Sequence, residues 1–342
     1  EGLFYINLPA MHPTPAYVSI PTALPYNDIA GTEGGFMFYG PPKDAYLWRP
    51  SVSAKLLEAI APHKPRVIFM AADQKPWSWY LHQPAETRLC IASAVANGAN
   101  IWYGLHGASH LLDTPGGRAG AAMMRFLAKH EAAYEGTASA ARVAVLYAYA
   151  TERVYRTSGE ESDLYGQSRE RRSFLGNFGE AVQGVCGALA GTGVPFDLVT
   201  DLDLSPATLE RYDCLFLADE ALAALRGYVA AGGNLVATMD TSLYTPAGEE
   251  RPDFGLADVF GAHYLGRPVH YHNWNYVSVA AAHPLLAGLE VPLLPAPAVG
   301  LEVEAHGSAQ VLARFHGVMS GRYVDLTPPE KPAILLNRYG RG

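Results

Sequence analysis

The chain has 342 residues, of which 49% are hydrophobic, and a formal net charge of -8. This length and composition suit a globular protein with room for two domains, and they exclude a disordered chain. The acidic balance offers no basic surface to nucleic acid or to an anionic membrane. A neutral or weakly polar substrate is therefore expected.

Three cysteines, Cys90, Cys186 and Cys214, each stand inside an apolar run. An odd number of such residues argues against a disulfide framework and favours a reducing compartment, which predicts a cytoplasmic protein. No stretch approaches the roughly 20 unbroken apolar residues of a membrane-spanning helix. The sequence begins as if within a strand and ends on a turn, so we expect it to be part of a longer protein.

Short apolar runs alternate with helical patterns from residue 1 to about residue 137, which predicts strands of a parallel sheet with helices between them. The predicted strands are Leu3 to Leu8, Tyr17 to Thr22, Arg66 to Ala72 and Asn100 to Leu105. The predicted helices are Ser51 to Ala61, Pro84 to Asn97 and Gly117 to Tyr134. Only His12 to Ala16 separate the first two strands, too few for a crossover of roughly a dozen residues.

A linker at Gly136 to Ser139 predicts a second domain over residues 138–342. Its strands and helices alternate in a doubly wound, flavodoxin-like pattern. The predicted strands are Arg142 to Tyr147, Phe196 to Val199, Cys214 to Leu217 and Asn234 to Met239, and the predicted helices are Glu180 to Ala190 and Ala221 to Ala230. From Pro268 onward, shorter strands interrupted by proline predict additional sheet.

Polar side chains mixed with aromatic rings fill three predicted loops: Asn27 to Gly35, Ala72 to Tyr80 and Tyr103 to Gly107. In a (β/α) barrel the functional groups lie in the loops after the strands. Rings can stack on the apolar face of a sugar, while carboxylates hydrogen-bond its hydroxyls and transfer protons. The three loops therefore predict a sugar-binding site.

Glu33 and Asp73 are the candidate catalytic residues. Glycines after Glu33 leave its carboxylate accessible, although a solvated loop glutamate would look the same. Asp73 stands two residues before Lys75, and a surface ion pair is the alternative. The candidate substrate-binding residues are Asn7, Asp28, Lys75, Trp77, Trp79, Trp102 and His106. The tryptophans would be sugar platforms, although Trp77 and Trp79 would be core residues if their segment were a strand.

No metal or cofactor is expected. His106 and His110 have helical ligand spacing, but Gly107 interrupts them and a third ligand is not evident. Gly116 to Arg118 precede a helix without the Lys-Ser/Thr pair of a phosphate-binding loop. The second domain also lacks a nucleophile on a glycine-flanked turn, because Cys214 stands within a strand.

The sequence from about residue 140 to residue 265 resembles the β-galactosidase trimerisation domain. The resemblance rests on four stretches: Arg142 to Tyr147, Val194 to Val199, Tyr212 to Leu217, and Tyr228 to Gly261 with its segments YVAAGGNLVAT and DFGLADVFG. In that family the domain follows a (β/α)8 barrel and packs subunits into a trimer. The first domain is similar to glycoside-hydrolase barrels found with that domain, and more distantly to family 42 β-galactosidases.

The resemblance implies the C-terminal half of a (β/α)8 TIM-type barrel followed by a flavodoxin-like, class I glutamine amidotransferase-like α/β domain. It also implies a homo-oligomer, with a trimer favoured. Two departures are present: the family's acid/base glutamate comes from an earlier barrel strand, and the family has several more residues between Ala218 and Asp219.

Two functions from different classes follow. The first is a glycoside hydrolase that cleaves a β-linked sugar with two carboxylates, Glu33 being the nucleophile or its electrostatic partner. The second is a non-catalytic carbohydrate-binding or oligomeric scaffold protein. A second carboxylate across the site from Glu33 would favour the first, at about 5–5.5 Å for retention or 6.5–9.5 Å for inversion. Neither function involves nucleic acid or a membrane.

Overall fold

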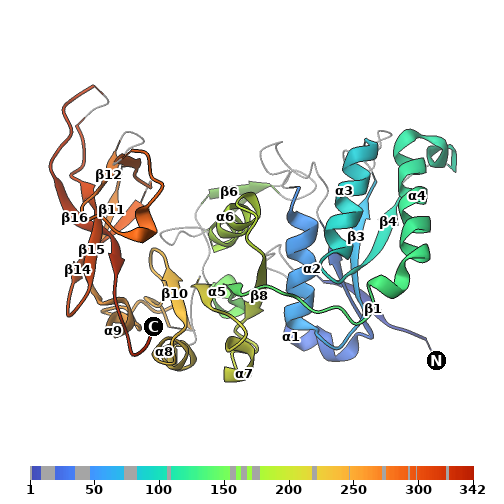
Figure 1. The fold of residues 1–342 in the computed structure, drawn as a ribbon, viewed down its shortest axis with the longest axis horizontal. Helices are drawn as coiled ribbons and strands as arrows, with labels where there is room; N and C mark the ends of the chain where they lie inside the picture. Colours follow the sequence, from blue (N-terminus) through green and yellow to red (C-terminus); the bar gives the residue numbers. More distant parts are fainter. Residues whose placement is uncertain are drawn as a thin grey trace. The chain divides into compact units, whose positions relative to one another are not determined.

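The structure is a computed structural model, and its helices and strands follow the chain as shown in Figure 1. It describes residues 2–8, 20–34, 47–72, 83–105, 109–154, 159–162, 168–171, 178–217, 222–245, 247–271, 275–291, 293–297, 299–320 and 323–342. The chain divides into two compact units. Unit 1 comprises Glu1–Val145, Ser162–Gln167 and Gln183–Leu202, and unit 2 comprises Leu146–Glu161, Ser168–Val182 and Asp203–Gly342.

A four-stranded parallel sheet opens unit 1, with its strands in the consecutive order β1-β2-β3-β4. The strands are β1 (Tyr5–Leu8), β2 (Ile29–Glu33), β3 (Arg66–Ala71) and β4 (Asn100–Gly104). The helices α2 (Arg49–Ile60), α3 (Pro84–Val95) and α4 (Pro115–Lys129) follow β2, β3 and β4. Helices α2 and α3 contact each other, as do α3 and α4 (Figure 1).

Helix starts in this unit are encoded locally. Pro84 opens α3, where the Glu86 carboxylate accepts the Gln83 N–H at 2.7 Å. Pro115 opens α4, where the Thr114 hydroxyl oxygen accepts the Gly117 N–H at 3.2 Å. Proline fits the first turn because its missing N–H would have no partner there, and the side-chain oxygens satisfy N–H groups that the helix leaves unpaired.

The sheet has one face covered by helices. Tyr103 of β4 hydrogen-bonds Thr87 of α3 at 2.9 Å between the two hydroxyl oxygens, and its ring lies against Gly120 of α4. Ile68 and Met70 on β3 are almost fully buried. Right-handed crossovers between consecutive neighbouring strands bring every connecting helix to the same face, which accounts for this one-sided cover.

Side chains along a strand point alternately to its two faces. Every second residue of these strands therefore points to the face opposite the helices. We call this opposite side the Trp102 face. The registers of the four strands place on it Tyr5, Asn7, Gly31, Glu33, Phe69 and Trp102. Trp102 keeps 53% of its surface exposed, and Asn7 is also exposed, so the described residues leave this face partly open.

The strand predicted over Tyr17 to Thr22 is wrong. Residues 17–19 lie outside the described part of the chain, but α1 (Ile20–Ala23) and the 3-10 helix η1 (Leu24–Tyr26) occupy the described remainder. The second strand is instead Ile29–Glu33, in a segment expected to be a loop. Residues 9–28 therefore separate β1 from β2, and the spacing between strands is no longer too short for a crossover.

A second four-stranded sheet has the order β10-β9-β5-β8, and its β9 and β10 are parallel. The strands are β5 (Val143–Tyr147), β8 (Phe196–Thr200), β9 (Cys214–Leu217) and β10 (Asn234–Ala237). The helices along this stretch are α5 (Tyr149–Val154), α6 (Phe178–Gly191), α7 (Pro206–Leu209) and α8 (Leu222–Ala230). All strands and both long helices expected between residues 142 and 239 are present, with ends shifted by at most two residues.

The last part of unit 2 contains short antiparallel sheets. Strands β11 (Ala262–His270) and β14 (Val299–Ala305) form one pair. A second sheet has the order β13-β12-β15-β16 and consists of β12 (Tyr276–Val279), β13 (Leu293–Pro295), β15 (Gln310–His316) and β16 (Pro329–Leu336). The remaining elements are β6 (Gly159–Ser162), β7 (Ser168–Arg171), α9 (Ala257–Phe260) and the 3-10 helices η3 (Ser109–Asp113), η4 (Glu131–Ala133) and η5 (Pro284–Leu286).

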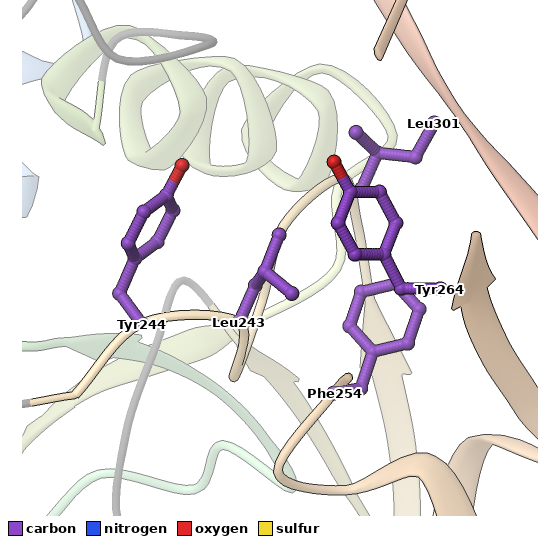
Figure 2. Close-up of a cluster of buried hydrophobic side chains, with 5 residues drawn as sticks. All are labelled: Leu243, Tyr244, Phe254, Tyr264 and Leu301. Atoms are coloured by element: carbon purple, nitrogen blue, oxygen red, sulfur yellow. The ribbon is translucent and has the colours of Figure 1, made fainter. Parts of the chain in front are cut away.

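A hydrophobic cluster anchors the β11–β14 pair to the segment before it. Figure 2 shows the cluster, whose members are Leu243, Tyr244, Phe254, Tyr264 and Leu301. The rings of Phe254 and Tyr264 lie with their centroids 5.9 Å apart. Burial of these large side chains is the main stabilising contribution to this part of the fold. None of the helices in the described ranges has both the length and the apolar character that a membrane crossing requires.

Candidate functional site

Glu33 is the last residue of β2, at the carboxyl end of the parallel sheet. Asn7 on the neighbouring strand donates a hydrogen bond from Nδ2 to Oε1 of Glu33 at 3.0 Å. The register explains the contact, because Asn7 pairs with Gly31 and the two residues therefore share a face with Glu33. This hydrogen bond holds Oε1 of the carboxylate in place.

Tyr5 lies on the same face, two residues before Asn7 on β1. Its ring covers Gly31 so closely that a Cβ atom at position 31 would come within 2.0 Å of the ring. Only glycine leaves room for the ring at this position. Burial raises the pKa of Tyr5 above its ordinary value of 10.0, and the nearby charge of Glu33 raises it further. The Tyr5 hydroxyl therefore remains protonated, and it can donate a hydrogen bond.

Trp102 on β4 is an exposed large aromatic residue of the Trp102 face. Phe69 packs edge-on against its ring at a centroid distance of 5.1 Å, and Tyr5 packs against it at 5.9 Å. These contacts hold the indole in place while half of its surface stays accessible. An exposed, fixed aromatic ring beside a carboxylate and an amide is a combination that suits a sugar ligand.

Asp28 does not join this group. It precedes β2, and its Oδ2 accepts the Phe4 N–H at 2.7 Å at the amino end of the sheet. Glu33 is five steps along the extended chain from Asp28, which corresponds to about 16 Å at ~3.3 Å per step. The sequence placed Asp28 in the same loop as Glu33 because it missed the strand between them, and the contact with Phe4 indicates a role in ordering the start of β1.

Five other candidates lie outside the described residues: Asp73, Lys75, Trp77, Trp79 and His106. Their roles stay predictions. The described strands β3 and β4 end immediately before residues 72 and 105, respectively, at the same sheet edge as Glu33. Within the described ranges, no three His, Cys, Asp or Glu side chains cluster as a metal site would require.

Tyr5 and Phe69 are the residues of this face that the sequence-based site missed. Tyr5 lies two residues before the candidate Asn7 on β1. Phe69 lies on β3 and pairs with the candidate Glu33 on β2. Once Ile29–Glu33 is recognised as a strand, the two-residue period places Tyr5 with Asn7. The signal was therefore present in the sequence, but it depended on the correct position of β2.

The cysteines show no sign of nucleophilic activation. All three are free thiols, and Cys214 lies within β9 as expected. Burial raises the pKa of Cys90 to about 11 and that of Cys186 to about 12, and burial also raises the pKa of Cys214. A thiol must lose its proton to act as a nucleophile, so raised pKa values disfavour a nucleophilic role for these three residues.

No family model and no curated protein sequence matches the chain. Several solved structures have a similar fold at low identity. The β-galactosidase of Rahnella sp. R3 matches with a TM-score of 0.69 and 19% identity, over 95% of this chain and 48% of that one. The β-galactosidase of Bacillus circulans sp. alkalophilus matches with a TM-score of 0.69 and 17% identity, over 92% and 46%.

The similarity extends to enzymes that act on other sugars. The α-L-fucosidase isoenzyme 2 of Paenibacillus thiaminolyticus matches with a TM-score of 0.63 and 16% identity, over 92% of this chain and 45% of that one. The exo-β-1,4-mannosidase Op5Man5 of Opitutaceae bacterium strain TAV5 matches with a TM-score of 0.54 and 12% identity. The chain thus has a mixed α/β fold found in glycoside hydrolases and spans about half the length of the first three.

Proposed function

We propose that the chain is part of a glycoside hydrolase that cleaves a β-linked sugar on the Trp102 face. The observation that carries the proposal is the placement of Glu33, Asn7 and Trp102 together at the carboxyl end of a parallel sheet. Functional groups of parallel α/β folds gather at this end. The four enzymes named above, which have a similar fold, are glycosidases, and this supports the proposal at the level of fold.

The first sheet is proposed to be a segment of a (β/α)8 barrel. A doubly wound sheet reverses its strand order and carries helices on both faces, whereas a barrel keeps consecutive order with all helices outside. The order β1-β2-β3-β4 and the helices gathered on one face support the barrel. The Trp102 face would then be part of the barrel interior, with Glu33 at its catalytic mouth.

The second domain, residues 138–342, is proposed to be the trimerisation-like α/β domain with additional strands from about residue 268. Numbered along the chain, the order β8-β5-β9-β10 reads 2-1-3-4, which is how a flavodoxin-like sheet begins. The raised pKa values of its thiols agree with a role in assembly and not in catalysis. We propose that the protein is a homo-oligomer, with a trimer favoured.

In the proposed mechanism, the Glu33 carboxylate attacks or stabilises the oxocarbenium-like centre, and a second carboxylic acid protonates the leaving oxygen. The hydrogen bond from Asn7 keeps Glu33 in one orientation during this step. Trp102 would hold the apolar face of the sugar. Asp73 is the second carboxylate that the sequence offers at this edge of the sheet.

The proposal is tested with a panel of aryl glycosides on the intact protein, followed by Glu33→Gln on any substrate that is cleaved. The variant keeps the size of the side chain and loses its charge, so turnover should fall by several orders of magnitude while affinity is roughly kept. Azide should restore some turnover to Glu33→Gly. Glu131→Gln, an exposed carboxylate of η4, is the control and should behave as wild type. Near wild-type turnover of Glu33→Gln would refute its catalytic role.

One observation favours the non-catalytic alternative. Glu33 is the only carboxylate among the described strand residues of the Trp102 face. A protein that binds sugar without cleaving it would need the exposed Trp102 ring and polar groups, but not a second carboxylate. Sugar binding without hydrolysis of any glycoside in the panel would establish this alternative.

A further inference from the structure

The Tyr5 hydroxyl oxygen is buried and has no hydrogen-bond partner in the described part of the structure. Folding removes such a group from water without compensation, so a buried unpaired hydroxyl lowers stability. Native proteins pair nearly all of these groups, and an exception calls for a physical reason. A hydroxyl that serves a ligand is one such reason, because the ligand supplies the missing partner.

Contacts with neighbouring residues hold the Tyr5 side chain in place. The strand register pairs Tyr5 with Ile29, and its ring extends over Gly31 toward the carboxyl end of β2, where Glu33 stands. The ring of Trp102 packs against the ring of Tyr5 at a centroid distance of 5.9 Å. The register places Tyr5 and Glu33 on the same face, and after burial the charge of Glu33 is the second cause of the raised pKa of Tyr5.

The chemistry of these groups selects the ligand. Asn7 already donates to Oε1 of Glu33, which leaves Oε2 as an acceptor, while the Tyr5 hydroxyl is a donor. A hydroxyl group accepts one hydrogen bond and donates another, so a single sugar hydroxyl can satisfy both residues. An anionic ligand would be repelled by Glu33, and an ammonium group could not accept a hydrogen bond from Tyr5.

We propose that Tyr5 is a substrate-binding residue whose hydroxyl donates a hydrogen bond to a sugar hydroxyl, and that the same sugar hydroxyl donates to Glu33. Gly31 makes this possible because any side chain there would displace the Tyr5 ring. The inference rests on the proposed function and adds to it a specificity-determining contact. It requires a neutral, hydroxylated ligand on the Trp102 face.

The test compares Tyr5→Phe with a matched control in the intact protein. Thr200 on β8 also has a buried hydroxyl without a partner in the described structure, and it lies on a different sheet. Thr200→Val therefore removes an equivalent hydroxyl away from the Trp102 face. Affinity for galactose, fucose, mannose and glucose is measured by titration calorimetry, and the melting temperature is measured for each variant.

Tyr5→Phe should weaken binding of the preferred sugar by about 10-fold, as expected for the loss of one hydrogen bond. Its melting temperature without sugar should be unchanged or higher, because an unpaired buried hydroxyl is removed. Thr200→Val should show the same thermal behaviour and bind sugar as wild type. Deoxy sugars add a sharper comparison: one of them should bind wild type more weakly, and that difference should be smaller in Tyr5→Phe, in which only the bond to Glu33 is still lost with the sugar hydroxyl.

The outcomes separate the two proposals. Equal sugar affinity of Tyr5→Phe and wild type would overturn the role of Tyr5 and leave the proposed function in place. Weaker binding together with a clear fall in melting temperature, and with every deoxy sugar discriminated as strongly as by wild type, would make Tyr5 a structural residue and also overturn the inference. If the wild-type protein neither binds nor cleaves any sugar, the proposed function fails and the ligand role of Tyr5 fails with it.

Discussion

A single hydrogen bond organises the carboxylate of the proposed site. A glutamate side chain at the end of a strand has several accessible rotamers, and the amide of Asn7 selects those that bring Oε1 within 3.0 Å. The hydrogen bond to a charged group is stronger than one between neutral groups. Loss of Asn7 would therefore allow the Glu33 carboxylate to turn away from the position that a bound sugar needs.

Trp102 provides a test at the same scale. Trp102→Ala should weaken sugar binding by about 1–3 kcal/mol, because it removes the main apolar contact of the face. Its cost in stability should be well below the ~3–5 kcal/mol of a buried tryptophan, since half of the ring is exposed. Titration with sugar and chemical denaturation measure the two quantities. Tyr134→Ala, another exposed aromatic residue, is the control, and a large stability loss with unchanged affinity would show that Trp102 is a core residue.

Individual site residues were predictable only where the strand around them was. Trp102 stands in β4, whose apolar run was recognised, and the structure places it on the same face as Glu33. The sequence predicts one loop for Asp28 and Glu33, yet the structure places them at opposite ends of β2. Residue type indicated the chemistry, but position required the register of the sheet.

At the scale of elements, apolar continuity decided which strands could be predicted. The run RVIFMA gives β3 unambiguously, whereas β2 has the sequence IAGTE, with two small residues and a terminal glutamate. Its burial comes from neighbours such as the Tyr5 ring over Gly31, which no local pattern reports. Helices α3 and α4 were predictable because proline and capping side chains mark their starts.

The contact of α2 with β8 supplies a prediction about elements. Lys55 on α2 and Asp197 on β8 form an ion pair at 3.4 Å, with side-chain exposures of 13% and 9%, and Ser139 donates to Asp197 at 2.7 Å. Lys55→Met removes a cation from beside a buried carboxylate and should cost about 3 kcal/mol of unfolding free energy in urea. Arg267→Gln, which removes an exposed cation 4.0 Å from Glu302, should cost less than about 1 kcal/mol. Equal losses of unfolding free energy in the two variants would contradict a stabilising role for the buried Lys55–Asp197 pair.

A second element-scale prediction concerns pH and the start of β11. Burial opposes ionisation of Asp253, but hydrogen bonds from the Tyr264 N–H, His263 and the Phe254 N–H outweigh it and lower its pKa below the ordinary value of 3.8. Because the pKa is lower in the folded state, the carboxylate stabilises the fold at neutral pH, and this contribution is lost as the pH falls below about 4. Between pH 5 and pH 3, the melting temperature of Asp253→Asn should therefore fall less than that of wild type. If the melting temperatures of Asp253→Asn and wild type fall by the same amount over this pH range, the stabilising role of the Asp253 carboxylate is contradicted.

At the scale of the whole molecule, assembly is the property to measure. The described residues of the proposed trimerisation-like domain form a four-stranded sheet with helices and further antiparallel sheets, and we propose that this domain contacts other subunits. Light scattering of the intact protein at micromolar concentration should give the mass of an oligomer, with a trimer favoured. A monomer across the accessible concentration range would refute this prediction.

The consecutive order of the first sheet has a consequence for solvent exchange. Strands β1 and β4 stand at the two ends of that order, so in the described structure each has a hydrogen-bonded neighbour on one side only. Alternate backbone amides of an edge strand point away from its partner and exchange with deuterated water quickly, whereas those of β2 and β3 are held on both sides. If further strands flank β1 and β4 in the intact protein, protection will instead be even across all four strands, and deuterium uptake in β4 will report directly whether the barrel is closed.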